Sequence, residues 1–87
     1  MAYIYRLHSV ERMFQRDISK VMVRQVLENG EIIERYPNDM PYPSALKLGF
    51  HLGLPLHVVY AKDEESNTII ITVYKLDTKK WEKDFKT

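Results

Sequence analysis

The stretch LHVVYAKDEESNTIIITVYK, residues 56–75, contains the two strongest strand patterns in the chain. Residues 56–61 and 68–75 are rich in valine, isoleucine and tyrosine, which favour strands, and the polar segment 62–67 between them has the composition of a turn. A short polar connection of this kind favours antiparallel pairing of the two strands. The stretch therefore predicts two neighbouring antiparallel strands.

Alternation along these two strands predicts which side chains share a face. We expect His57, Thr72 and Tyr74 to meet on the side of the sheet that the helices do not cover. A histidine, a hydroxyl and a phenol on neighbouring strands could bind a phosphate or move protons, or they could simply be a polar and aromatic pairing across a sheet. The residues expected to face the helices are Leu56, Val58, Ile69, Ile71 and Val73.

Upstream of this stretch, residues 31–36 and 44–50 predict two further strands. Residues 37–43 hold three of the four prolines and predict a loop, and residues 51–55 predict a hairpin connection. Residues 2–5 could form a short edge strand.

Two helices are predicted before these strands. Residues 8–16 show helical spacing of apolar residues, and residues 20–29 follow Ser19 as a helix N-cap and precede Gly30 at the position of a C-terminal glycine. The pattern predicts an α+β fold in which two helices pack on one face of an antiparallel sheet of about four strands, leaving the other face half open. The residues expected to be mostly buried are Leu7, Val10, Phe14, Val26, Leu27, Val58, Ile71 and Val73.

The composition limits the function classes. Eighty-seven residues with 45% apolar content predict a single domain spanning residues 1–87, and the lack of cysteine excludes disulfide frameworks, thiolate metal sites and cysteine nucleophiles. His8, His51 and His57 have no metal-ligand spacing, and no glycine-rich phosphate loop or nucleophile elbow is present. We therefore expect no metal and no cofactor. The N-terminal segment does not resemble a signal peptide and no apolar run is long enough for a bilayer, so we expect a cytoplasmic protein.

The first predicted helix raises the question of a site. His8, Arg12 and Arg16 follow at i, i+4 and i+8 and form a stripe beside Glu11. Such a stripe could be an ordinary solvated face or could hold an anion such as an RNA phosphate. Residues 1–24 carry five basic against two acidic side chains, a balance of +3, which can attract a polyanion.

The chain also resembles a known family in ordered blocks. The blocks are LHSVERMFQRDIS (residues 7–19), VLENGEIIERYP (26–37), PLHVVYA (55–61), IIITVYKLD (69–77) and the tryptophan at position 81. They are similar to the bacterial "domain of unknown function 4258" family. The resemblance implies a small toxin of the RelE and MqsR type, with two helices on a curled antiparallel sheet. It also implies RNA cleavage and a small, zinc-binding antitoxin-like protein as partner. The polar positions that match the family pattern are His8, Glu11, Arg12, Arg16, Tyr36, His57 and Tyr74.

These observations lead to a functional hypothesis. Histidine, arginine, glutamate and tyrosine are the residues that a metal-independent ribonuclease needs for a base, cations and an acid. In this reading His57 or Glu11 is the base and Tyr74 or His8 is the proton donor. The candidate catalytic residues are His57, Tyr74, Arg12, Arg16, His8 and Glu11. The alternative is a non-catalytic binding module that uses the open sheet face for a protein or RNA partner, and a homodimer is left open.

Overall fold

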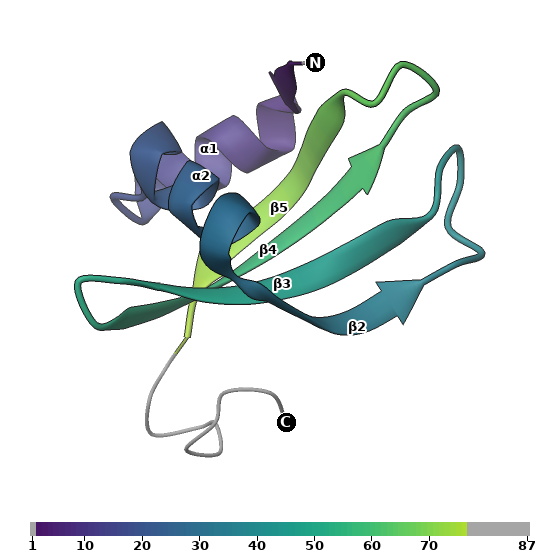
Figure 1. Cartoon of the computed structure of the whole chain (residues 1–87). Coiled ribbons are helices and arrows are strands. Elements are labelled where there is room, and N and C mark those ends of the chain that lie inside the picture. Colours follow the sequence, from purple (N-terminus) through teal and green to yellow (C-terminus); the bar gives the residue numbers. More distant parts are fainter. Residues whose placement is uncertain (1, 77–87) are drawn as a thin grey trace.

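The computed structural model describes residues 2–76 as two helices and five strands in the order β1-α1-α2-β2-β3-β4-β5 (Figure 1). The two predicted helices and four predicted long strands are confirmed, with ends within two residues of those expected. The sequence of residues 77–86 predicts a short helix or extended arm that places Trp81 and Phe85 on the body of the protein, and this segment lies outside the described residues. The elements are β1 (Tyr3–Tyr5), α1 (Leu7–Gln15), α2 (Lys20–Asn29), β2 (Glu31–Tyr36), β3 (Ser44–His51), β4 (Leu54–Lys62) and β5 (Thr68–Lys75).

The sheet has five strands rather than about four, because the possible edge strand of residues 2–5 is present as β1, and the sheet is mixed rather than wholly antiparallel. Its order is β1-β5-β4-β3-β2, and β1 lies parallel to β5 with Tyr3 opposite Thr68 and Tyr5 opposite Ile70. Thr68 N donates to Ala2 O at 2.8 Å at the start of this ladder. Three residues are too few to show an alternating pattern, so the strand exists because its backbone pairs with the outer edge of β5.

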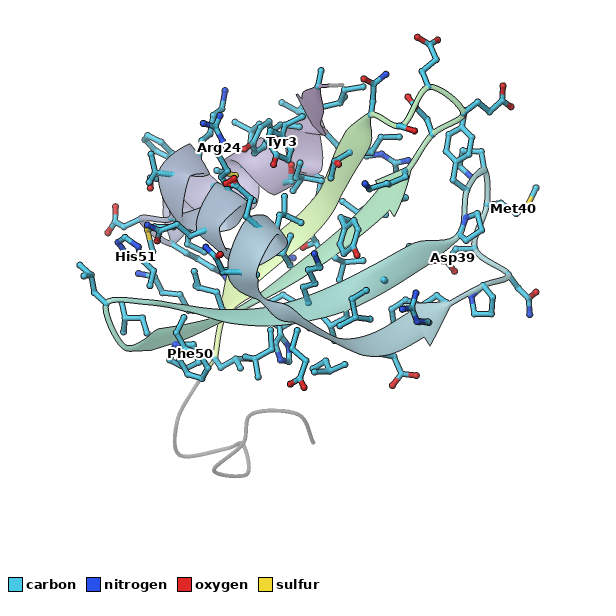
Figure 2. All side chains as sticks on the ribbon, viewed as in Figure 1. Tyr3, Arg24, Asp39, Met40, Phe50 and His51 are labelled. Atoms are coloured by element: carbon cyan, nitrogen blue, oxygen red, sulfur yellow. The ribbon has the colours of Figure 1, made fainter. Side chains whose placement is uncertain are left out.

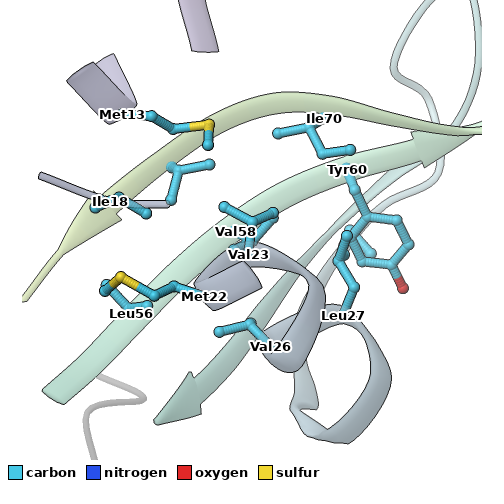
Figure 3. Packing of buried hydrophobic residues seen from close by; sticks show 12 residues of the cluster. Met13, Ile18, Met22, Val23, Val26, Leu27, Leu56, Val58, Tyr60 and Ile70 are labelled. Atoms are coloured by element: carbon cyan, nitrogen blue, oxygen red, sulfur yellow. The ribbon is translucent and has the colours of Figure 1, made fainter. Parts of the chain in front are cut away.

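Both helices lie on one side of the sheet, as predicted (Figure 1). Helix α1 packs on β5, and α2 packs on β3 and β4. Figure 3 shows the helix-facing core between these layers, in which Val23 and Val26 of α2 meet Val58 of β4. Within residues 2–76, neither helix is long and apolar enough to cross a membrane. The helix-facing core consists of Met13, Ile18, Met22, Val23, Val26, Leu27, Ala45, Leu56, Val58, Tyr60, Ile70 and Val73.

A bulge in β5 changes the predicted faces of that strand. The register between β4 and β5 shifts by one residue, so that Tyr60 pairs with Ile70 and Ile71 has no directly opposed partner in the ladder. The extra residue inverts the alternation, and Ile70 rather than Ile69 or Ile71 joins the helix-facing core. The prediction that Ile69 and Ile71 face the helices is therefore wrong, whereas the same prediction for Val73 is confirmed.

Helix α1 is rotated relative to the prediction. Leu7, Val10 and Phe14 are 74%, 41% and 85% exposed, so the expectation that they are buried is wrong. The buried residues of α1 are Ser9 and Met13, and the Ser9 hydroxyl donates to Arg6 O at 2.7 Å. Helix α1 packs on β5, and Ser9 and Met13 are its buried residues. The side of the helix that carries Leu7, Val10 and Phe14 faces outward.

The second helix crosses β3 closely because of two glycines. Ser19 caps α2 as predicted, with its side chain accepting from Met22 N at 3.2 Å. A Cβ on Gly49 would lie 2.8 Å from a methyl carbon of Val26, and one on Gly30 would lie 2.6 Å from Leu48 O. Gly30 ends the helix as expected, but its φ of −78° is not left-handed. The glycine at this position therefore permits close approach rather than a left-handed turn.

Candidate functional site

The sheet face that points away from the helices brings His57 and Tyr74 together, as the alternation predicted. The two residues are directly opposed across β4 and β5. Their Nδ1 and Oη atoms are 3.3 Å apart, and the ring centroids are 5.3 Å apart in an edge-to-face arrangement with an interplanar angle of 72°. We call this face of the sheet the second face.

The second face is much less open than expected. His57 is 0% exposed, and its neighbours on β3 and β4, Leu48 and Ala61, are also buried. Beside Ala61, the loop of residues 37–43 borders a cavity of about 240 Å³ together with Ile71. The prediction of a half-open face is therefore wrong, and a substrate would meet the partly exposed Tyr74 before it met His57.

The phenol of Tyr74 is held in its protonated form. Burial raises the pKa of Tyr74, and the nearby Tyr36 raises it further, because two phenolate charges would repel each other. Tyr36 ends β2, opposite Ser44, and lies close enough for its charge to act on that of Tyr74. We call Tyr36, His57 and Tyr74 the tyrosine–histidine cluster. A protonated phenol beside an imidazole nitrogen can pass its proton to that nitrogen, so the cluster is suited to proton transfer.

The four candidate residues of α1 do not join this cluster. Met13 of α1 packs in the helix-facing core, so the sheet separates the whole helix from the second face. His8, Glu11 and Arg16 are exposed and Arg12 is half-buried. The structure thus brings together two of the six predicted catalytic residues and places the other four in the opposite layer. The stripe on α1 is a separate polar surface, and its role as an anion site stays a prediction.

The three histidines also occupy separate places. His8 lies on α1, His57 lies on the second face, and the Nδ1 atom of His51 contacts Oε1 of Gln25 at 2.5 Å. In the part of the chain from residue 2 to residue 76, no three histidine or acidic side chains gather where they could hold a metal ion.

Two residues near the second face were not among the predicted catalytic groups. Tyr36 ends β2 and interacts with Tyr74, and Arg6 lines the cavity with Ala61 and Ile71. The sequence does contain a signal for Tyr36, since this residue ends a predicted strand and matches the family pattern. Arg6 lies between β1 and α1, where neither strand nor helix periodicity applies, so no sequence pattern indicated its position.

Comparison with known proteins places the chain in a family. A family model described as "Domain of unknown function (DUF4258)" matches residues 5–75. The match runs from the end of β1 to the end of β5 and includes the whole tyrosine–histidine cluster. No curated protein and no solved structure is significantly similar to the chain. Since the match covers most of the 87 residues, the chain belongs to the DUF4258 family.

Proposed function

We propose that the protein is a metal-independent endoribonuclease of the RelE-like toxin type, in which Tyr74 and His57 transfer the proton. The observation that carries this proposal is the 3.3 Å contact between Tyr74 Oη and His57 Nδ1 on a face where the phenol stays protonated. The α+β architecture, with two helices on one side of a largely antiparallel sheet, is consistent with the RelE-like fold that the family resemblance implies.

The proposed reaction is attack by a ribose 2′-hydroxyl on the adjacent phosphorus. As the new O–P bond forms, the hydroxyl proton moves to Tyr74 Oη, and the phenol passes its own proton to His57 Nδ1. The bond from phosphorus to the 5′-oxygen then breaks, and that oxygen takes a proton from the second phenol, Tyr36. The products are a 2′,3′-cyclic phosphate and a 5′-hydroxyl. Since His57 is fully buried, it acts through Tyr74 rather than on RNA directly.

Charge stabilisation in this reaction would come from the second face and not from α1. Arg6 lines a cavity on this face and is the cation we assign to the phosphate. Arg12 and Arg16 lie on the other side of the sheet, so they can contact only phosphates away from the reacting one. His8 and Glu11 have no role in the proposed proton transfer.

Cleavage of RNA in EDTA tests the proposal. We expect the purified protein to cut a labelled single-stranded RNA without added metal, with or without ribosomes present, and to leave 2′,3′-cyclic phosphate ends detectable by mass spectrometry. The matched control is the same RNA with 2′-O-methyl groups, which lacks the attacking hydroxyl and should stay intact. Cleavage that requires added metal, cleavage of the methylated RNA, or no cleavage in either setting would each contradict the proposal.

A second candidate function is a protein-binding module, and the outward side of α1 favours it. Leu7, Val10 and Phe14 lie at i, i+3 and i+7, and we call them the α1 ridge. Exposed apolar side chains aligned on one helix face are typical of a surface that a partner covers. The +3 balance of residues 1–24 favours an acidic partner, such as the small antitoxin-like protein that the family resemblance implies. The zinc that the family resemblance implies would be bound by this partner and not by the chain described.

Substitution of the ridge is expected to release such a partner. Phe14→Ser should weaken co-purification with a co-expressed antitoxin-like partner by on the order of 10–100-fold, because Phe14 is the most exposed residue of the ridge and aromatic anchors dominate interface energies. The matched control is Leu52→Ser, at an apolar residue that is 92% exposed and lies in the turn between β3 and β4 rather than on α1. Equal recovery of partner with both variants would contradict the ridge as its binding surface. A wild-type dimer that Phe14→Ser converts to monomer would instead assign the ridge to a homodimer.

A further inference from the structure

A group of cations surrounds Tyr60, apart from the tyrosine–histidine cluster. The Tyr60 side chain borders two cavities of about 350 and 170 Å³. Arg35 and Lys62 line the first, and Lys47 and Lys62 line the second. These side chains come from β2, β3 and β4, at the end of the sheet where β4 turns into β5. We call the two cavities and the residues Arg35, Lys47, Tyr60 and Lys62 the Tyr60 groove.

The three cations of the groove lie close enough to affect one another and Tyr60. Lys47 Nζ is 5.3 Å from the centroid of the Tyr60 ring and donates to Leu27 O. Burial lowers the pKa of Lys47, and the positive charge of Lys62 lowers it further. The pKa of Tyr60 is raised by burial, and the positive charge of Arg35 partly opposes this effect. The groove therefore has a positive potential in a partly desolvated setting.

The cations of the groove are not paired with carboxylates within residues 2–76. None of the three cations forms an ion pair with a described acidic side chain. Two acidic residues adjoin these cations in the sequence: Glu34 precedes Arg35, and Asp63 follows Lys62. The Oδ1 atom of Asp63 accepts from the backbone N–H groups of Glu65 and Asn67 at 2.9 Å each. Asp63 therefore stabilises the turn between β4 and β5. The Tyr60 groove has donors without matching acceptors.

We propose that the Tyr60 groove binds a phosphate group of an RNA strand or nucleotide. Phosphate oxygens accept hydrogen bonds from ammonium, guanidinium and phenol groups, and the groove supplies all three kinds. Lys47 uses one N–H for Leu27 O and has two left for a ligand. The Tyr60 oxygen points away from the helix-facing core, towards the outside of the protein (Figure 3). This inference does not depend on RNA cleavage.

The rings beside the groove are already covered by cations, which argues against a site for a base. Arg24 lies 5.4 Å from the Tyr3 ring centroid, and Figure 2 shows the two side chains side by side. Lys47 similarly covers the ring of Tyr60. Because a cation covers each of these two rings, binding is expected to depend on the phosphate and to show little preference among bases.

Fluorescence anisotropy with a labelled, 2′-O-methylated oligouridylate tests the proposal. This probe cannot be cleaved by 2′-hydroxyl attack, so its binding is measured whether or not the protein is a ribonuclease. Each phosphate contact to a single strand contributes a salt slope of about 0.7, so Lys62→Met should weaken binding about fivefold at about 0.1 M salt and reduce the slope by about 0.7. Lys62 is exposed, so this variant is expected to fold. Lys47→Met should have a similar effect.

The control variant is Lys75→Met, which loses the same charge at the other end of β5. Its binding should stay within about twofold of wild type, since Lys75 lies outside the groove and a screened distant charge has a small effect. Titration with uridine monophosphate and with inorganic phosphate, followed by NMR at the amides of Tyr60 and Lys62, distinguishes a nucleotide site from a site that needs a strand. Equal weakening by Lys62→Met and Lys75→Met, or no binding of any probe, would overturn the proposal.

Discussion

Replacing Tyr74 with phenylalanine is expected to slow RNA cleavage by roughly 10²–10⁴-fold, the usual cost of losing a general acid or base. The change removes only the hydroxyl that contacts His57 Nδ1, so the ring stays in place against the imidazole. His57→Gln should cause a loss of similar size, since the proton has no acceptor without the imidazole. Rates are measured on labelled RNA in EDTA, with circular dichroism confirming that each variant folds.

The matched control for the Tyr74 variant is Tyr5→Phe. Tyr5 lies on β1 in the helix-facing layer, and its buried hydroxyl has no hydrogen-bond partner among residues 2–76. Its removal should leave the cleavage rate unchanged. The predicted role of Arg12 gives a second comparison, because Arg12→Ala should reduce the rate far less than Tyr74→Phe if the reaction occurs on the second face. A Tyr74→Phe variant that cuts as fast as wild type would show that Tyr74 takes no part.

Cleavage should also depend on pH in a defined direction. The pKa of Tyr74 is raised above its ordinary value of 10.0 by burial and by Tyr36, so the phenol stays protonated throughout the neutral range. The relay needs this proton to pass to His57, so the rate should not fall from loss of the Tyr74 proton until the pH exceeds 10.

Replacing Leu56 with alanine is expected to destabilise the protein by roughly 2–5 kcal/mol. Leu56 is 0% exposed and is one of the largest fully buried side chains in the helix-facing core. Its truncation removes apolar contacts and leaves a cavity that the close-packed layers cannot fill. Because small domains are stable by only about 5–15 kcal/mol, this loss would be a large part of the total. Urea denaturation followed by circular dichroism measures it.

Two alanine variants serve as references for Leu56→Ala. Ile71 lies at the β5 bulge and is half-buried, so Ile71→Ala should cost less than Leu56→Ala. Leu52 is 92% exposed at the turn between β3 and β4, and Leu52→Ala should change the unfolding free energy by no more than about 0.5 kcal/mol. If Ile71→Ala is the more costly of the two core variants, the assignment of faces along β5 is reversed.

The parts of the fold that could be predicted are those with strong local patterns. Helix α2 has a cap residue, a buried apolar face and a terminal glycine, and β4 is a strand rich in leucine, valine and tyrosine. The bulge in β5 could not be predicted, because Ile69, Ile70 and Ile71 are identical residues and any of them is suited to a core. Only the pairing with Tyr60 determines that Ile70 faces the helices.

The candidate site was predictable to the same extent as the strands that form it. His57 and Tyr74 meet because the register between β4 and β5 is regular from Leu56 to Val59, before the bulge. The predicted combination with Arg12 and Arg16 failed because a helical pattern does not determine which face of a sheet the helix will cover. The rotation of α1 could not be predicted either, because the apolar side of an amphipathic helix can pack against the core of its own chain or against a partner.

The parallel pairing of β1 with β5 has a consequence for how the chain is made. Ala2 N donates to Asn67 Oδ1 across 65 residues of sequence, so β1 cannot form its ladder with β5 until β5 has left the ribosome. Long-range contacts of this kind form late in folding, because the intervening chain must be ordered first. Tyr74 lies on β5 as well. A nascent chain would therefore complete the described sheet at the same step at which the phenol of the proposed reaction is placed opposite His57.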